Sequence, residues 1–263
     1  MSRFASPRAA LAALLTAALS GCLSYSPHEI PSGGNVRADN EAWLASRPEP
    51  ARLKFAVVGD VQNGFDEAED AIDRLNEEED LSFVVQVGDF TDLGLSDEFE
   101  LMSDVFEELR VPWFVVVGNH DLLGSGPRIF DELFGPRNFE LVHRRTRFVF
   151  LDTNSREYGF DGRAPDLDWL AERVAPGPDH DRVVVLSHVW PFSTDFDPEL
   201  RDRYLALLGE AGVALSLHGH EHNYRAEVHA GVPYFVADHV WRRAFLLVEE
   251  LPTGALEVRR VEF

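Results

Sequence analysis

Short apolar runs alternate with stretches of helical periodicity along most of the chain after residue 52. The runs LKFAVV, SFVVQV, PWFVVV and DRVVVL contain few polar positions, so we expect strands that are covered on both faces. The intervening stretches have the apolar spacing of helices that bury one side. These predicted helices span residues 65–78, 96–110, 164–174 and 197–212.

The pattern changes toward the C-terminus. Residues 138–144 and 146–153 are predicted to pair as a hairpin, and the short apolar segments after residue 213 leave little room for a long helix. We expect antiparallel strands in this last part. A mostly parallel front and a strand-rich back together predict an α/β fold in which two packed mixed β-sheets are flanked by helices.

The N-terminus has a pattern of its own. Arg3 and Arg8 precede an apolar stretch over residues 9–19 that ends in small residues, which is typical of a signal peptide. The stretch is too short to cross a hydrocarbon core of about 30 Å. We therefore predict a cleaved leader over residues 1–21.

The sequence LSGC at residues 19–22 resembles the lipobox of bacterial lipoproteins, in which the cysteine is lipidated. Cys22 is the single cysteine of the chain, so it is predicted as a lipidation site; a free thiol in an unprocessed leader is the alternative. Residues 22–51 are rich in Pro, Gly and Ser and are predicted to form a flexible tether to one domain over residues 52–263. The expected location is outside the cytoplasm, anchored to a bacterial membrane.

Composition narrows the class of protein. Of the 263 residues 45% are hydrophobic, which excludes a disordered chain, and the formal net charge is −22. Because so acidic a surface repels a polyanion, no nucleic-acid partner is expected.

Five clusters of polar residues each follow directly after one of the predicted strands. They are GDVQ from Gly59, GDFTD from Gly88, GNHD from Gly118, the histidine of SHVWP at His188, and GHEH from Gly219. Loops at the carboxyl ends of parallel strands meet at one edge of a sheet, where ligands bind. Taken singly, each Asp could cap a helix and each His could be structural; five clusters in order favour one shared site.

In that order the clusters resemble those of the calcineurin-like metallophosphoesterases, over about residues 54–224. The resemblance implies a phosphoric ester hydrolase, acting on a monoester or a diester, with two divalent ions such as Mn, Fe or Zn. It implies that the first ion is bound by Asp60, Gln62 and His222, that Asp89 bridges both ions, and that Asn119, His188 and His220 bind the second.

The resemblance also implies a chemical mechanism. A hydroxide held between the ions would attack phosphorus, and His120 would protonate the leaving group, oriented by a carboxylate such as Asp92. The structural alternative is that Asp92 or Asp121 pairs with His120 to fix a loop. A noncatalytic, metal-binding surface lipoprotein is the alternative function.

Three further expectations concern individual segments. Gln62 stands where histidine is commonest in this family, and a looser first metal is expected because an amide oxygen is a weaker ligand than imidazole. Residues 122–137 are expected to form a loop over the cleft. The remaining histidines lack a neighbouring motif and are not predicted as ligands, namely His28, His143, His180, His218, His229 and His239.

Overall fold

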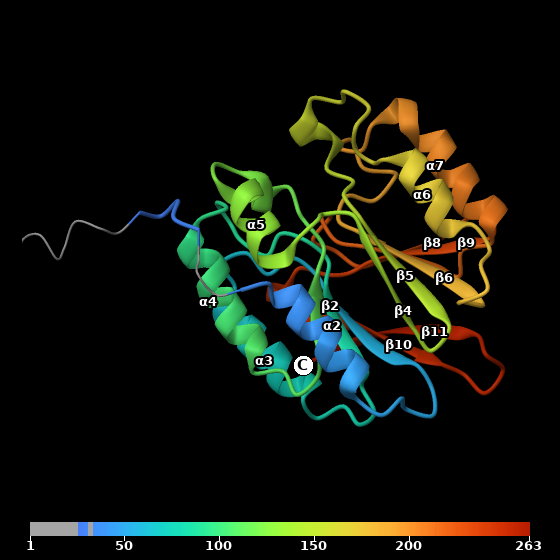
Figure 1. Cartoon of the computed structure of the whole chain (residues 1–263), viewed down its shortest axis with the longest axis horizontal. Helices are drawn as coiled ribbons and strands as arrows, with labels where there is room; N and C mark the ends of the chain where they lie inside the picture. Colours follow the sequence, from blue (N-terminus) through green and yellow to red (C-terminus); the bar gives the residue numbers. More distant parts are fainter. Residues whose placement is uncertain (1–25, 31–33) are drawn as a thin grey trace, which may run out of the picture.

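The computed structural model describes residues 26–30 and 34–263, and these form two β-sheets flanked by helices (Figure 1). One sheet has the strand order β11-β10-β1-β2-β3, and the other has the order β4-β5-β6-β7-β9-β8. The strands are β1 (Lys54–Val58), β2 (Phe83–Gln86), β3 (Trp113–Val115), β4 (Phe139–His143), β5 (Thr146–Leu151), β6 (Arg182–Ser187), β7 (Leu215–His218), β8 (Arg225–His229), β9 (Val232–Val236), β10 (Ala244–Glu250) and β11 (Leu256–Glu262). The α-helices are α2 (Val36–Ser46), α3 (Phe65–Leu75), α4 (Ser96–Glu107), α5 (Gly126–Phe134), α6 (Leu167–Val174) and α7 (Pro198–Ala211), and short 3-10 turns cover His120–Leu122, Ser155–Tyr158 and Val240–Arg242.

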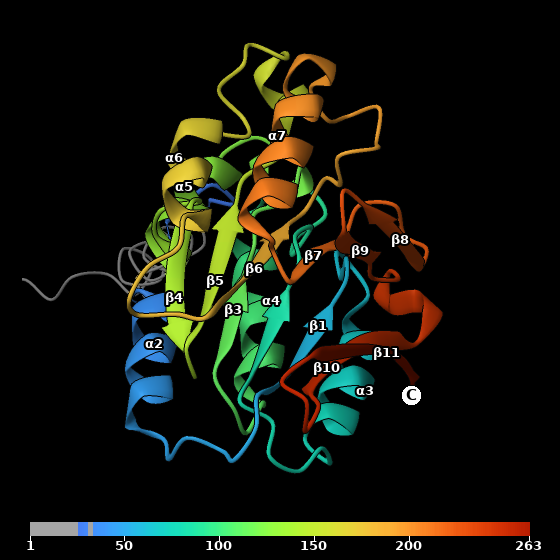
Figure 2. The ribbon, with the colours of Figure 1, turned by 90° about the vertical axis from the view of Figure 1, so that its right-hand side faces the viewer.

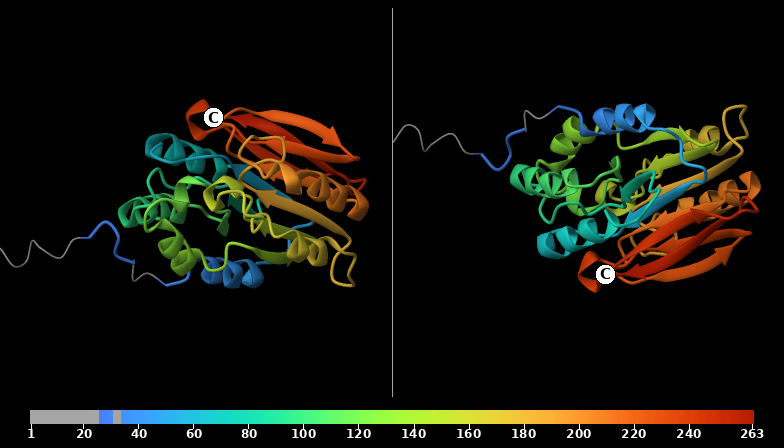
Figure 3. Two further views of the ribbon diagram at one scale, coloured as in Figure 1. Left: turned by 90° about the horizontal axis from the view of Figure 1, so that it is seen from above. Right: turned by 90° about the horizontal axis from the view of Figure 1, so that it is seen from below.

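Three apolar clusters define the layers. One fills the space between the sheets, where Phe55 and Phe83 stack and Phe148 meets both rings edge-on. A second joins the five-stranded sheet to α3, α4 and α5, and a third joins the six-stranded sheet to α6 and α7. Figure 3 shows the strands between these two groups of helices. The predicted sandwich of two sheets between helices is confirmed.

Strand direction brings distant loops to one edge. β1, β2 and β3 are mutually parallel, and so are β5, β6, β7 and β9. The carboxyl ends within each parallel set therefore lie at one edge, and Figure 2 shows the strands of both sheets beside one another. The predicted hairpin of β4 and β5 is also present, with Phe139 opposite Phe150.

The expectation of antiparallel strands after residue 213 is wrong in part. β7 pairs in parallel with both β6 and β9, for example through Ser216 and Tyr234, while β8, β10 and β11 pair antiparallel as expected. The apolar spacing of a strand is the same in both directions, so the sequence pattern contains no information on this difference.

The prediction of a flexible tether over residues 22–51 does not hold for residues 36–46. These form α2, which contacts β3 and α5. Asn35 caps the helix, Leu44 joins the apolar cluster between the sheets, and the buried Asn40 accepts a hydrogen bond from the Trp113 backbone at 2.9 Å. Pro27 is also held, because its carbonyl accepts from Ser96 N at 3.0 Å. The contacts of Asn40 and Pro27 fix these residues to the domain.

Residues 122–137 differ from expectation as well. A loop was expected because the segment directly follows GNHD, but residues 126–134 form α5. Its apolar residues Ile129, Phe130, Leu133 and Phe134 recur at helical spacing and are buried against α4 and the sheet. The helix serves the core, since Phe134 packs against Phe90 at 5.5 Å between ring centroids.

The predicted leader and Cys22 lie outside the described residues. In the part of the chain that the structure describes, no helix combines the length and the apolar character that a membrane span needs.

Candidate metal centre

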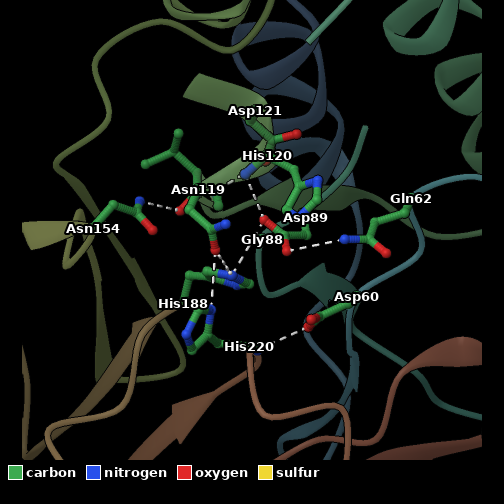
Figure 4. Close-up of polar contacts among 12 residues, drawn as sticks. Asp60, Gln62, Gly88, Asp89, Asn119, His120, Asp121, Asn154, His188 and His220 are labelled. Atoms are coloured by element: carbon green, nitrogen blue, oxygen red, sulfur yellow. Dashed lines mark hydrogen bonds and ion pairs between the residues drawn. The ribbon is translucent and has the colours of Figure 1, made fainter. Parts of the chain in front are cut away.

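The strand-end side chains predicted as ligands lie together at the carboxyl edge of the two sheets (Figure 4). Asp60, Asp89 and Asn119 follow β1, β2 and β3 of one sheet, whereas His188 and His220 follow β6 and β7 of the other. The amide nitrogen of His220 donates to Asp60 Oδ1 at 2.9 Å across the junction. Each sheet thus contributes part of the site.

One group of potential ligand atoms belongs to Asp60, Asp89 and His222. Their ligand atoms all lie within 4.8 Å of one another. Asp60 Oδ2 is buried and accepts no hydrogen bond from the described residues, although His222 Nε2 lies only 2.9 Å away. A buried carboxylate oxygen without a donor is costly unless a cation compensates it, so this group fits a metal ion.

A second group surrounds Asn119. The Asn119 Oδ1 atom lies 3.0 Å from both His188 Nε2 and His220 Nδ1. His188 Nε2 is also 3.2 Å from Asp89 Oδ1. The Asp89 carboxylate therefore belongs to both groups, as a bridging ligand would. Mixed oxygen and imidazole donors suit Mn, Fe or Zn.

Each histidine of the second group is oriented by a partner of the ring nitrogen that does not face the site. His188 Nδ1 donates to the Val87 carbonyl at 2.8 Å, which leaves the lone pair of Nε2 for the site. His220 Nε2 lies 3.2 Å from Asp195 Oδ2, which leaves Nδ1 for the site. A ligating histidine commonly has such a partner on its other nitrogen, and this partner fixes the ring and its tautomer.

The electrostatics favour a positive charge between Asp89 and His188. Burial by itself would raise the pKa of Asp89 and lower that of His188. The attraction between the two groups overrides burial in both cases, so the pKa of Asp89 is lowered and the pKa of His188 is raised. The pair thus shows that a positive charge is stabilised beside the buried Asp89 carboxylate.

Gln62 lies at the edge of the first group. Its Nε2 is 3.3 Å from Asp89 Oδ2, and its Oε1 is 3.2 Å from Nε2 of the buried His239. The His239 ring lies 4.8 Å from the His222 ring. Burial lowers the pKa of His239 to about 4, so this imidazole is neutral near pH 7.

His120 lies beside Asp89 but makes its main side-chain contact with Asp92. His120 Nδ1 donates to the Asp92 carbonyl oxygen at 2.7 Å, whereas the Asp92 carboxylate is 3.5 Å away. The main chain of Asp92 therefore orients the ring more closely than its side chain does. The opposite nitrogen, Nε2, stays available as a proton donor.

Backbone conformation at the site is unusual. Gln62, Asp89, His220 and His222 all have positive φ, between 42° and 71°. Each such residue costs of the order of 1 kcal/mol and persists where surrounding contacts enforce it. Gly118 is required for a different reason, because a Cβ there would collide with the backbone nitrogen of Asp89.

Two residues of the site were not predicted from the sequence. His239 follows β9, just as the predicted ligands follow their strands. Its position after a strand could have identified it, but it was set aside because it has no neighbouring motif. Asp195 lies in a loop without any such signal. It pairs with Arg156 at 3.1 Å and meets His220 through the fold.

Comparisons with known proteins agree with this geometry. The family model described as calcineurin-like phosphoesterase matches residues 53–224. A curated relative from Arcobacter nitrofigilis, a probable glycerophosphodiester phosphodiesterase GpdQ, is 28% identical over 193 residues; the match covers 67% of this chain and 66% of the relative, just under two thirds of its length.

Solved structures with low sequence identity share the fold. GAP50, the anchor in the inner membrane complex of Plasmodium, superposes with a TM-score of 0.64 at 15% identity, covering 81% of this chain and 85% of its own. Purple acid phosphatase PPD1 from yellow lupin seeds gives a TM-score of 0.61 at 12% identity, covering 82% of this chain and 52% of its own. From the match of the family model over most of the folded domain, the chain belongs to the calcineurin-like phosphoesterase family.

Proposed function

We propose that the protein is a phosphoric ester hydrolase that acts through two divalent metal ions. The observation that supports this most directly is that the Asp89 carboxylate belongs to both of two groups of potential ligand atoms. Asp60 and His222 would hold the first ion with Asp89. Asn119, His188 and His220 would hold the second.

Charge explains how so acidic a protein would accept a phosphate. The chain carries a formal net charge of −22, but Asp60 and Asp89 supply just two negative charges among the proposed ligands. Two divalent ions would leave the site positive and would supply Lewis acidity together with a water acidified to near-neutral pKa. The local charge, and not the surface average, would decide which ligand binds.

His120 is proposed as the general acid. The hydrogen bond from Nδ1 to the Asp92 carbonyl fixes the ring. Its Nε2 would then protonate the leaving oxygen, and the nearby Asp92 carboxylate would stabilise the protonated ring. The described residues therefore support both a binding role and a proton-transfer role for the site.

The test uses the chain without its predicted leader, residues 22–263. Bound metal is measured after purification, and hydrolysis of p-nitrophenyl phosphate and bis(p-nitrophenyl) phosphate is followed with Mn, Zn and Fe. We expect turnover that is lost in Asp89→Asn and retained in His229→Asn, a surface control paired with Glu227. Two bound metals without turnover on any ester would support the noncatalytic alternative instead.

Membrane attachment is a separate proposal that rests on the sequence of residues 1–22. A lipid on Cys22 would hold the domain at a membrane outside the cytoplasm. In bacterial cells, labelled palmitate should enter the wild-type protein and fail to enter Cys22→Ser. Equal labelling of both, or of neither, would contradict lipidation at Cys22.

A further inference from the structure

Gln62 lies between two buried partners that determine how its amide is oriented. The side chain is 6% exposed, and its two ends face Asp89 and His239. The oxygen and nitrogen of an amide have nearly the same shape, so the orientation follows from what each neighbour can donate or accept.

His239 fixes one end of the amide. The backbone N–H of Trp241 donates to His239 Nδ1 at 3.1 Å. Because Nδ1 is the acceptor, the proton of the neutral ring is on Nε2, and Nε2 must donate. Its neighbour at 3.2 Å must then be the oxygen of Gln62; the flipped amide would place two donors against each other.

Asp89 fixes the other end in the same sense. Its Oδ2 atom is a carboxylate oxygen, which accepts hydrogen bonds, and the Gln62 atom 3.3 Å away must therefore be the nitrogen. An oxygen at that position would repel the carboxylate. Two independent neighbours thus select one orientation.

We propose that His239 is a positioning residue that turns the oxygen of Gln62 away from the first metal position. This inference rests on the proposed function and revises the expected role of Gln62. Asp60, Asp89 and His222 would then be the side chains that bind the first ion, and Gln62 would donate an N–H to Asp89. The second ion would have four side-chain ligands and the first ion three.

The segment that carries His239 is well placed for this role. Val240 N donates to the Asp60 carbonyl at 2.9 Å, which ties the segment to the loop that carries both Asp60 and Gln62. The Trp241 indole packs on the His239 ring with centroids 4.2 Å apart. His239 itself is 2% exposed, so its ring has little freedom to turn.

The proposal makes an unusual prediction for His239→Asn. An asparagine oxygen still accepts the Trp241 N–H two residues on but no longer reaches Gln62. Released, Gln62 can rotate its oxygen toward the metal and add a ligand. The first Mn²⁺ should then bind more tightly, by about tenfold, which is the lower end of the usual effect of residues that contact metal ligands.

The experiment is a double-mutant cycle on residues 22–263, with Mn²⁺ binding measured by calorimetry. His239→Asn should tighten the first-site affinity in the wild-type background, and it should not tighten it in the Gln62→Leu background, where no amide oxygen is present to be released. Binding to the second site is the internal control, and His229→Asn is the matched surface control. Thermal melting establishes that each variant is folded.

Two results would overturn the inference. One is a loss of first-site affinity in His239→Asn, which is the result expected if His239 orients Gln62 as a ligand instead of turning its oxygen away from the metal position. The other is an equal effect of His239→Asn in both backgrounds, which would remove the coupling. The proposed function fails differently, through absence of turnover in a wild type that binds both ions.

Discussion

Asp89 and Asp121 are buried carboxylates that are close enough to repel each other, but they have different hydrogen-bond partners. Asp121 accepts hydrogen bonds from the backbone of Phe90, Thr91 and Gly118, at 2.8 to 3.2 Å, and also from the Thr91 hydroxyl. Burial and the charge of Asp89 raise the pKa of Asp121 to about 6. Asp121 thus joins the loop after β2 to the loop after β3, and this contact sets the spacing of Asp89 and Asn119.

Asp121→Asn should destabilise the protein. The amide nitrogen would replace an oxygen that accepts backbone N–H groups, leaving a buried donor facing another donor. We expect the free energy of unfolding to fall by about 1–3 kcal/mol. Urea denaturation measures this, with Asp202→Asn on the exposed side of α7 as the control. Equal urea midpoints for Asp121→Asn and wild type would show that the hydrogen bonds of Asp121 to the two loops do not stabilise the fold.

His120→Ala should keep both metals and lower turnover by about 10²–10⁴, the usual contribution of a general acid. The loss should be largest for esters with poor leaving groups, since these need the proton most. Metal content and kcat on a series of leaving groups measure the two effects. A loss that is the same for every leaving group would argue against proton donation.

Asp92→Asn should have a smaller effect than His120→Ala. The His120 ring is held by the Asp92 carbonyl at 2.7 Å, and the substitution keeps that carbonyl while removing the carboxylate charge at 3.5 Å. Comparing kcat of the two variants on one poor leaving group tests this order. Equal losses would mean that the carboxylate, and not the main chain, orients the ring.

At the scale of elements, position after a strand was the informative signal. The carboxyl ends of β1, β2, β3, β6 and β7 predicted where the ligand candidates would meet, because parallel strands end at a common edge. The orientation of Gln62 and the contact of Asp195 with His220 depend on partners far away in the chain, so local patterns contained no trace of them. The direction of β7 likewise depends on its pairing with β6 and β9, which local patterns in the sequence do not show.

The helix α2 was missed because few of its residues face the core. Asn40 and Leu44 are buried, and the rest of the helix is half-buried or exposed, so the apolar period is weak. One of the contacts that attach it is polar, a hydrogen bond from the backbone of Trp113 to Asn40. Sequence patterns that detect apolar stripes are insensitive to a helix held in this way.

Asn40→Ala should therefore cost stability although it removes a polar residue. The Trp113 N–H at the edge of the five-stranded sheet would lose its acceptor, and a buried unpaired donor costs about 1–3 kcal/mol. Chemical denaturation of Asn40→Ala and of Glu41→Ala, an exposed neighbour on the same helix, provides the comparison. No difference between the two variants would show that the hydrogen bond between Asn40 and Trp113 does not stabilise the fold.

At the scale of the whole molecule, the site lies across the junction of the two sheets. One sheet supplies Asp60, Asp89 and Asn119, and the other supplies His188 and His220. A cation held by side chains from both sheets would stabilise the folded chain and not the unfolded one. At a free concentration of one hundred times Kd, the gain per site is about 2.7 kcal/mol.

Removing metal should accordingly lower the melting temperature, and adding Mn²⁺ back should restore it. The shift should be reduced in His188→Ala, which lacks a proposed ligand from the six-stranded sheet. Differential scanning calorimetry with and without chelator measures it. The protein is first shown to bind both ions, and the chelator then removes them. An unchanged melting temperature after this removal would show that the cations do not link the sheets.

The route of the chain through the two sheets has a consequence for the order of events after synthesis. Asp60, Asp89 and Asn119 come from the first three strands, but the histidines become available only after β6 and β7, and His239 only after β9. A nascent chain that has emerged as far as β5 holds the oxygen donors and none of the proposed imidazole ligands. Loading of the proposed metal ions would thus be a late step, and a cell would have to deliver the ions where the finished protein resides.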